Sequence, residues 1–476
     1  MPYAAILSLE EVRDTRRRAE IRNRLHDRID QWLASLEARV KEPQPTLEQL
    51  TQAVFALRQE LTQAVTESLV EQRHQAVVEQ RTAVCQQCGQ TLSTRGPQER
   101  TVETLVGAIR LRRPYFYCER CQLGTAPLDE LLQVTARRKQ PDVQRAAVKL
   151  TKEVPYETAC ELFAELTGLP LSVHTAHAVT QAVAEGLTVL DVTPSRQEIL
   201  TKITAVAAGQ PWRPILVLAI DGADVPTRPE TAKGRRPGRK KVRAKRARWT
   251  GEWREAKGFR FYLIADDRIV QVLSWHQVQT DEEAAEALRQ VKAAGVIPEE
   301  EVRLCVIADG ARWIWKQAQT LFPSAVEIVD YYHCSEHVHK VAALQYGAHS
   351  ERQREWCEAA LARLFWGEVP GVIWGPQRMQ PTDAHAAEAI GKLIRYLQRP
   401  QERVDYRFAR KGGYPMGSGG IESANKFICH VRLKRSGAWW YVTHANQMLA
   451  LRCAKDHGTF DRVFERYRQR IQDRSG

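Results

Sequence analysis

Five apolar runs of strand length follow one another in the part of the chain that begins at residue 211, and their order limits the fold more than any other feature. The runs lie at 215–225, 259–265, 269–275, 304–308 and 325–329. The first three are consecutive, whereas segments of helical composition, 281–294 and 311–321, precede the last two. Three strands followed by alternating helix and strand predict a mixed sheet flanked by helices.

The rest of the chain is largely helical in composition. The 476 residues suggest about three domains of roughly 150 residues each. Residues 9–83 carry apolar side chains at three- and four-residue spacing, as a helix does. Residues 156–167 and 172–183, with Ser172 as N-cap, have the length and spacing of a helix-turn-helix pair. Residues 335–400 return to helical composition.

Two Cys-x-x-Cys pairs, Cys85 with Cys88 and Cys118 with Cys121, are separated by 29 residues of partly β-rich sequence. Two thiolates in a tight turn can chelate one ion, and two such turns complete the tetrahedral sulfur site that Zn²⁺ prefers. We therefore expect one structural Zn²⁺ without a catalytic role. The alternative is two redox-active or merely buried cysteine pairs. The other six cysteines are expected to be core thiols.

One segment makes the protein basic. The net charge is +13, and residues 228–248 alone contain eleven Lys or Arg and one acid, a charge of +10. Positive charge concentrated in this way favours a polyanion such as DNA. We expect a phosphate-binding arm, and the alternative is a solvated insert without function. The residues that this arm would offer to DNA are Arg235, Arg236, Arg239, Lys240, Lys241, Arg243, Lys245 and Arg246.

Three acids stand at the boundaries of predicted elements. Asp221 ends the apolar run 215–220 and Asp309 ends 304–308, and neither is expected to lead into a second strand of a hairpin. Carboxylates at the tips of neighbouring strands could jointly hold a divalent cation, although Asp-Gly is also ordinary turn chemistry. Glu422 lies in the first turn of a predicted helix, where the helix dipole favours an acid, but its position does not fit a capping box. As a metal ligand, Glu422 would face the two aspartates.

These acids stand in the order, and in the strand, strand and helix settings, of the DDE triad of RNase H-like transposases, which the chain resembles over roughly 210–450. The sequence Asp330-Tyr331-Tyr332-His333 resembles the D(2)H motif of Mutator-type transposases, which carry an all-helical insertion before the Glu. Two further blocks are similar to insertion-sequence transposases of the ISKra type, namely 417–424 and 432–439.

The resemblance implies a DDE transposase that cleaves and joins DNA at the ends of its own insertion sequence. Two Mg²⁺ or Mn²⁺ ions held by Asp221, Asp309 and Glu422 would support phosphodiester hydrolysis and transesterification. His333 would contact the scissile phosphate or the leaving group, or else it is a structural histidine behind the sheet. Double-stranded DNA and at least one further copy of the chain are the expected partners, and no small-molecule substrate is expected.

A second set of DNA contacts is expected close to Glu422, at Arg432, Lys434, Arg435 and Trp439. Arginine and lysine would contact the backbone, and Trp439 would stack on a base or belong to the core. Two other functions remain open. One is a DNA-binding regulator that has lost the reaction, and the other is a nuclease on the same RNase H-like fold.

Together these features predict a multidomain α/β protein. The first three expected parts are an N-terminal helical region (1–83), a Cys₄ zinc ribbon (84–130) and a helix-turn-helix-like DNA-binding unit (131–198). They are followed by the first part of the catalytic core (210–334), an all-helical insertion (335–415), and the last core helix with a C-terminal helix (416–476). No run reaches the eighteen or so apolar residues of a membrane helix, and no signal-peptide core is apparent. We therefore expect a cytoplasmic protein that associates with the nucleoid when it binds DNA.

Overall fold

The computed structural model describes residues 9–230, 250–265, 268–398 and 401–473. The contacts divide the chain into two compact units. Unit 1 consists of Met1–Thr180 with Phe464–Gly476, and unit 2 consists of Gln181–Val463. The basic residues predicted for the DNA-binding arm, 235–246, lie outside the described residues.

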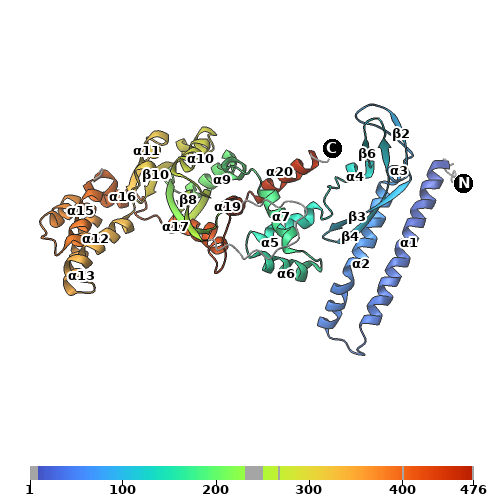
Figure 1. The fold of residues 1–476 in the computed structure, drawn as a ribbon, viewed down its shortest axis with the longest axis horizontal. Helices are drawn as coiled ribbons and strands as arrows, with labels where there is room; N and C mark the ends of the chain where they lie inside the picture. Colours follow the sequence, from blue (N-terminus) through green and yellow to red (C-terminus); the bar gives the residue numbers. More distant parts are fainter. Residues whose placement is uncertain (1–8, 231–249, 266–267, 399–400, 474–476) are drawn as a thin grey trace. The chain divides into compact units, whose positions relative to one another are not determined.

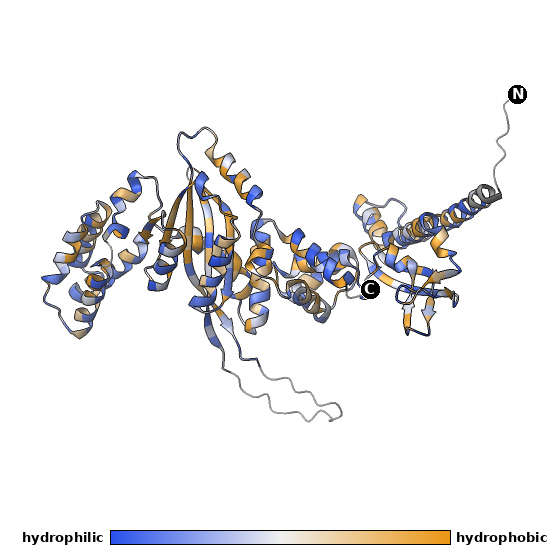
Figure 2. Cartoon of the chain, turned by 90° about the horizontal axis from the view of Figure 1, so that it is seen from above, coloured by the Kyte–Doolittle hydropathy of each residue, from blue (hydrophilic) through white to orange (hydrophobic). Residues whose placement is uncertain are grey.

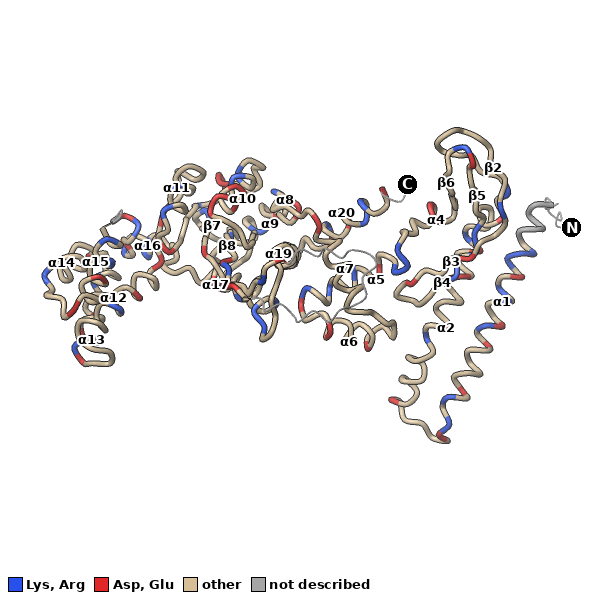
Figure 3. The backbone as a smooth tube through the Cα atoms, in the orientation of Figure 1, with Lys and Arg blue, Asp and Glu red and all other residues tan. Residues whose placement is uncertain are grey.

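Unit 1 begins with a helical hairpin. Helices α1 (Leu9–Arg39) and α2 (Leu47–Arg73) run antiparallel, and a short α3 (Gln75–Val78) follows. Charged residues recur along the hairpin (Figure 3), and Arg24 and Arg28 pair across it with glutamates of α2, each at 2.8 Å. The predicted helical character of this region is confirmed.

Six short strands form three hairpins in the cysteine-bearing part of unit 1. Their bounds are β1 (Thr82–Val84), β2 (Thr91–Ser93), β3 (Pro97–Thr104), β4 (Gly107–Pro114), β5 (Phe116–Cys118) and β6 (Leu123–Thr125). The long β3–β4 hairpin occupies the partly β-rich sequence between the two cysteine pairs.

The remaining helices of unit 1 are short. They are α4 (Pro127–Leu131), α5 (Pro141–Thr151), α6 (Tyr156–Thr167), α7 (Val173–Ala184), which continues into unit 2, and most of α20 (Phe460–Asp473). The predicted helix pair is present, with Gly168 in the left-handed conformation at φ +70° between its helices. Ser172 Oγ accepts the Thr175 amide at 3.1 Å, which confirms Ser172 as the N-cap. Residues 464–476 belong to this unit rather than to the catalytic region with which they were grouped, and Tyr467 Oη donates to Gln144 at 2.6 Å.

A five-stranded mixed sheet forms the centre of unit 2 (Figure 1), as the order of apolar runs predicted. Its strands are β7 (Ile215–Thr227), β8 (Glu252–Ala265), β9 (Arg268–Val278), β10 (Arg303–Ala308) and β11 (Val326–Val329), in the spatial order β11-β10-β7-β8-β9. The pairs β7–β8 and β8–β9 are antiparallel, whereas β10 and β11 run parallel to β7. Hydrophobic residues follow the strands along much of their length (Figure 2).

Helices cover both faces of this sheet. On one face lie α10 (Asp281–Ala293) and α11 (Arg312–Leu321), where the rings of Phe261 and Phe322 pack with their centroids 6.0 Å apart. On the other lie α17 (Gly419–Ala424), the π-helical η3 (Asn425–His430), α18 (Val431–Leu433) and α19 (Val442–His457). Three further short elements are α8 (Val189–Val192), α9 (Arg196–Ala207) and η1 (Glu299–Glu301).

Every described element of regular secondary structure between β11 and α17 is a helix. This segment contains α12 (Tyr331–Tyr346), α13 (Glu351–Phe365), α14 (Val369–Gln377), α15 (Ala384–Gln398), η2 (Gln401–Val404) and α16 (Tyr406–Lys411). Helices α13 and α15 agree with the helical composition of residues 335–400. No described helix combines the length and the apolar character that crossing a membrane requires.

Helix α17 approaches the sheet closely because Gly420 has no side chain. A Cβ atom at Gly420 would lie 2.3 Å from the buried Tyr262 ring, whereas a Cβ at Gly419 would meet nothing within 4 Å. Gly420→Ala is therefore expected to lower the free energy of unfolding by about 1–3 kcal/mol, and Gly419→Ala is expected to change it by less than about 0.5 kcal/mol. Denaturant unfolding of both variants tests this, and equal stabilities would contradict it.

Candidate active site and metal centre

The two cysteine pairs lie in two tight turns. Cys85 and Cys88 occupy the turn between β1 and β2, where the Gly89 amide donates to the Cys85 carbonyl at 2.9 Å. Cys118 and Cys121 occupy the turn between β5 and β6. Each turn contains a residue with positive φ, Gly89 at +73° in the first and Gln122 at +54° in the second. These turns direct the thiols inward rather than to solvent.

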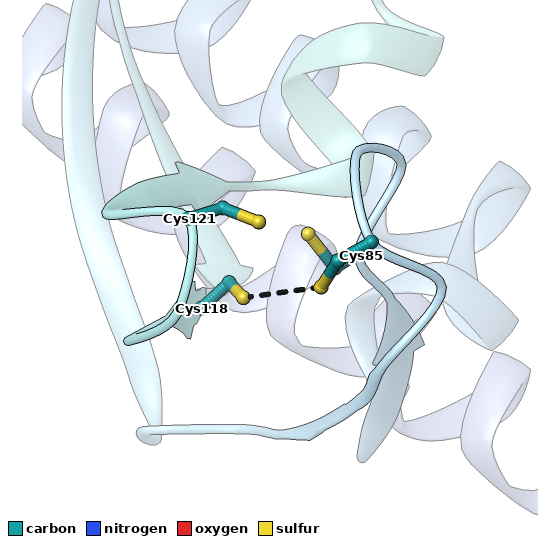
Figure 4. Close-up of side chains that lie close together, drawn as sticks. Cys85, Cys118 and Cys121 are labelled. Carbon is teal, nitrogen blue, oxygen red and sulfur yellow. Dashed lines mark hydrogen bonds between the residues drawn. The ribbon is translucent and has the colours of Figure 1, made fainter.

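The four sulfurs converge on one point. Their ligand atoms all lie within 4.8 Å of one another, and Cys88 Sγ and Cys118 Sγ are 3.7 Å apart. Figure 4 shows Cys85, Cys118 and Cys121 pointing toward one another from the two turns. Sulfurs about 2.3 Å from a tetrahedral zinc ion would be about 3.8 Å apart. The group could therefore hold a metal ion such as zinc.

The thiols are electrostatically unequal. Hydrogen bonds from the backbone of Cys88 and then Gln87 lower the pKa of Cys85 to about 7. The hydrogen bond with Cys88, followed by burial, raises the pKa of Cys121 to about 12. A metal binds thiolates, so its binding would release protons from this cluster. The other six cysteines are buried, as predicted for core thiols.

The strand pairing brings two of the three predicted acids together. Ile220 of β7 and Ala308 of β10 are partners in a parallel ladder. The next residues along the two strands are Asp221 and Asp309, so their side chains start from adjacent backbone positions. Asp309 ends its strand, as predicted, and its Oδ1 accepts the Ala311 amide at 3.0 Å.

The prediction that Asp221 ends its strand is wrong. Strand β7 continues to Thr227, and residues 221–227 pair with β8 in an antiparallel ladder. The two strands form a long hairpin, and the basic insert lies in the sequence that connects them. The Asp-Gly pair looked like a turn, but Gly222 takes an ordinary strand position, since its backbone is paired with Lys257. Asp221 therefore lies within a continuous strand, on a more rigid support than a strand tip.

Helix α17 carries the third acid, Glu422, on its exposed side. The buried Arg260 of β8 donates from Nη1 to the Gly420 carbonyl at 2.7 Å, which ties the first turn of this helix to the sheet. Glu422 thus projects from an anchored turn on the same face of the sheet as α19.

The pKa of Asp221 reports on its surroundings. Burial raises this pKa, a hydrogen bond from the Gly222 backbone lowers it, and the charges of Asp309 and Glu422 raise it further. The charge of His333 lowers it. The three acids and His333 are therefore electrostatic neighbours, and negative charge accumulates at Asp221.

The Asp330 side chain joins the parts of this site. Its Oδ1 accepts the amides of Tyr332 at 2.6 Å and His333 at 3.2 Å, so it caps α12, and its Oδ2 accepts the Ser418 amide at 2.6 Å. The Asp330 amide donates to the Ala308 carbonyl at 2.9 Å. The buried Asp330 carboxylate therefore connects the turn that carries His333 with the loop before Glu422, and the Asp330 backbone amide ties both to the end of β10.

The donor set suits a hard divalent cation, because carboxylate oxygens are the ligands that Mg²⁺ and Mn²⁺ prefer. Among the described residues, the four cysteines are the one group of three or more potential ligands whose ligating atoms all lie within 4.8 Å of one another. The carboxylate oxygens of the three acids therefore do not all lie within that distance of one another.

The root of the basic insert and the segment after α18 form one surface. The Trp440 amide donates to the Pro226 carbonyl at 3.0 Å, and the Arg228 amide donates to the Trp440 carbonyl at 2.9 Å. Trp253 and Trp439 pack edge to face with centroids 6.1 Å apart, and Lys434 Nζ lies 5.3 Å from the Trp253 ring centroid. Two regions predicted separately to contact DNA are thus adjacent.

Four residues of the second predicted DNA-contact set have different surroundings. Lys434 and Arg435 are exposed, and Trp439 is half-buried. Arg432 is only 3% exposed and lies over the buried Trp440 ring, with 4.9 Å between the guanidinium carbon and the ring centroid. The expectation that Arg432 contacts DNA does not agree with this position, because its side chain packs in the core.

Three residues were not predicted from the sequence, namely Asn425 beside Asp221, His276 behind Asn425, and Trp253 on the surface around Trp439. Asn425 donates from Nδ2 to Asp221 Oδ2 at 2.9 Å, and its Oδ1 lies 3.0 Å from Nε2 of the buried His276. Trp253, which is 52% exposed, joins the surface around Trp439. Asn425 follows Glu422 by three residues, the spacing of side chains on one helix face, and that was the available signal. No sequence pattern marked His276 or Trp253.

No protein-family model and no curated protein matches the chain. Among solved structures, the chain is similar to one from the Drosophila P element transposase strand transfer complex. The TM-score is 0.24 and the sequence identity 10%, over 70% of this chain and 80% of that one. Similarity this distant assigns neither a family nor a function.

The cysteine cluster leads to a metal-content prediction. Cys88→Ser is expected to remove one equivalent of bound zinc, because three remaining thiolates and a hydroxyl bind zinc far more weakly. Cys160→Ala, a buried cysteine outside the cluster, should keep that equivalent. Metal analysis of the purified variants measures both, and zinc retained by Cys88→Ser would refute the site.

The raised pKa of Asp221 leads to a stability prediction. A carboxyl whose folded pKa exceeds its unfolded value contributes stability below the unfolded pKa, and this contribution is lost as the pH rises through the folded pKa. At pH 7 with EDTA, Asp221→Asn should therefore melt at least about 2 °C above the wild type. The difference should shrink as the pH falls toward about 4.

Asp224→Asn, an exposed position on the same strand, serves as the control and should melt with the wild type. Thermal unfolding of the three proteins at both pH values is the measurement. An Asp221→Asn variant that melts below the wild type at pH 7 would contradict the assigned burial and repulsion.

Proposed function

We propose that this protein is a DDE-type DNA transposase that cleaves DNA at the ends of its insertion sequence and joins those ends to a target. The observation that carries the proposal is the parallel ladder that ends at Ile220 and Ala308, because it brings Asp221 and Asp309 to adjacent positions. Glu422 completes the set from α17, near enough for its charge to raise the pKa of Asp221.

The order of the sheet supports an RNase H-like catalytic domain. Three antiparallel strands followed by two strands parallel to the first, with helices on both faces, is the arrangement that such a domain has. The helical segment between β11 and α17 matches the all-helical insertion that the resemblance implies. Tyr396 of this segment donates from its hydroxyl to the Asp309 carbonyl at 2.6 Å, which links the segment to the turn after β10.

Asp221, Asp309 and Glu422 would hold two Mg²⁺ or Mn²⁺ ions. When bound, such ions neutralise charge on a phosphodiester and activate a water or 3′-hydroxyl for in-line attack. The charges of Asp309 and Glu422 oppose ionisation of Asp221, and a bound cation would offset this repulsion, which supports the assignment. The rigid strand and the anchored helix would hold the carboxylates in place throughout the reaction.

His333 would contact the scissile phosphate or the leaving group. It lies in the first turn of α12, which Asp330 caps, and its side chain is 44% exposed. Its Nδ1 is 3.5 Å from Glu336, an exposed residue one turn further along the same helix, so the ring is not buried behind the sheet. An exposed imidazole at this position is able to approach a phosphate.

Two surfaces would bind the DNA. The basic insert would supply affinity through phosphate contacts, beginning at the root that Trp440 pairs with. Lys434, Arg435 and Trp439 would contact the backbone and bases beside it. The helix pair α6–α7 would recognise the element ends, the zinc ribbon would serve as a structural module, and a dimer or larger assembly would hold two ends together.

The test is Mg²⁺-dependent nicking and strand transfer on duplex DNA that carries the candidate element ends. Asp221→Asn and Glu422→Gln should each lower both activities at least about 10³-fold, because the carboxylates act as a unit. Asp224→Asn, an exposed acid on the same strand, should retain activity. Gel-shift assays should show that all the variants still bind the DNA.

Three other outcomes of these assays would contradict the proposal in different ways. Activity that survives either active-site substitution would show that the triad is misassigned. Tight DNA binding with no cleavage by any form would favour the regulator. Cleavage without strand transfer would favour the nuclease.

A further inference from the structure

A chain of hydrogen bonds leads from the acidic site into the core. Asn425, which is 5% exposed, begins the π-helical η3 directly after α17. Its Nδ2 donates to Asp221 Oδ2 at 2.9 Å and lies 3.4 Å from the Gly222 carbonyl. Its Oδ1 is 3.0 Å from Nε2 of His276, a fully buried side chain of β9.

The orientation of the Asn425 amide follows from its neighbours. The Gly222 carbonyl can only accept a hydrogen bond, and so can an ionised Asp221 carboxylate, so the amide NH₂ group must face both. The amide oxygen then faces His276, whose Nε2 must carry the proton. The other ring nitrogen, Nδ1, has no hydrogen-bond partner among the described residues, so Asn425 is the polar group that fixes this ring.

A glycine lets His276 reach Asn425 across a whole strand. Gly258 of β8 is the partner of Asp221 on one side and of His276 on the other. A Cβ atom at Gly258 would lie 2.2 Å from His276 Cδ2, so the imidazole occupies the space that a side chain would fill. The three residues form a row across β7, β8 and β9.

We infer that Asn425 is a positioning residue for Asp221 and that His276 holds Asn425 in its orientation. The inference rests on the proposed function. Asn425 engages Oδ2 of Asp221 and fixes the rotation of the carboxyl group, so that its remaining lone pairs stay available to a cation shared with Asp309 and Glu422. It also joins the strand of Asp221 to the helix of Glu422, so that the two ligands keep their spacing.

Residues that hydrogen-bond to a metal ligand typically account for about 10–100-fold in metal affinity or activity. The measured quantity is the binding of Mn²⁺ to the full chain without DNA, followed by the electron paramagnetic resonance signal of free Mn²⁺. The Mn²⁺ sites that the wild type has and Asp221→Asn lacks are the sites whose affinity is compared. Asn425→Ala is expected to weaken that binding about 10–100-fold, with the same number of sites at saturation.

The matched control is Asn446→Ala. Asn446 of α19 also links a helix to the sheet, through hydrogen bonds of 2.8 and 3.1 Å with the Val278 backbone, but within the described parts of the chain its side chain has no hydrogen bond to an acid. It should leave Mn²⁺ affinity unchanged. A merely structural role for Asn425 would instead lower the fraction of folded protein in both variants and leave the dissociation constant of the folded fraction unchanged.

A second pair of variants keeps the inference testable if Asn425→Ala does not fold. His276→Ala should weaken Mn²⁺ binding less than Asn425→Ala does, because Asn425 remains but can rotate. His276→Gln should restore part of the affinity, since the glutamine amide nitrogen can replace Nε2 as a donor. Nicking assays on the same variants should show a raised half-saturating Mg²⁺ concentration.

The outcomes separate the two proposals. The positioning role would be overturned if Asn425→Ala left both nicking and Asp221-dependent Mn²⁺ binding unchanged. If Asn425→Ala does not fold, the same result in both His276 variants would overturn it. The transposase proposal would remain intact in either case. A wild-type protein without Asp221-dependent Mn²⁺ binding and without nicking would overturn the proposed function, and the positioning role with it.

Discussion

Six residue pairs join β7 to β10 in a parallel ladder from Ile215 with Arg303 to Ile220 with Ala308, and the acidic site is built outward from the end of that ladder. Strand β10 stops there, because Gly310 turns the chain at φ +103° into α11. Strand β7 continues, because β8 pairs with it as far as Thr227. One aspartate therefore sits on a turn and the other on a rigid strand, and the capping side chain of Asp330 ties α12 and α17 to the same edge.

This arrangement depends on close approach between backbone segments and on buried polar groups, and burying those polar groups lowers the stability of the folded chain. Gly420 lets α17 contact the sheet, and Gly258 leaves room for the ring of His276. Burial lowers the pKa of His276 to about 3 and raises that of Asp221, so the folded chain holds a neutral imidazole and a carboxyl group that would each be better solvated in water. Such features are expected where function, rather than stability, selects the residues.

The cysteine-bearing part of unit 1 has a different basis for its stability. Its buried apolar cluster consists of Ala83, Cys85, Leu92, Phe116 and Cys118, of which two are candidate metal ligands. A core of this size is too small to stabilise the short β1–β2 and β5–β6 hairpins without a further link between them. A metal ion on four thiolates would supply that link, so the prediction of zinc from spacing and the small core of the structure agree.

The sequence by itself determined the succession of strands and helices and the two cysteine turns, because periodicity and short-range spacing encode each of them. It did not determine that β7 extends beyond Asp221 or that Arg432 is buried, since both depend on partners distant in the chain. The hydrogen bonds of Asn425 join residues more than 140 positions apart, and a single sequence carries no record of such pairs. Only the tertiary structure decided them, because a side chain's partners are set by which strands pair and which helix covers them.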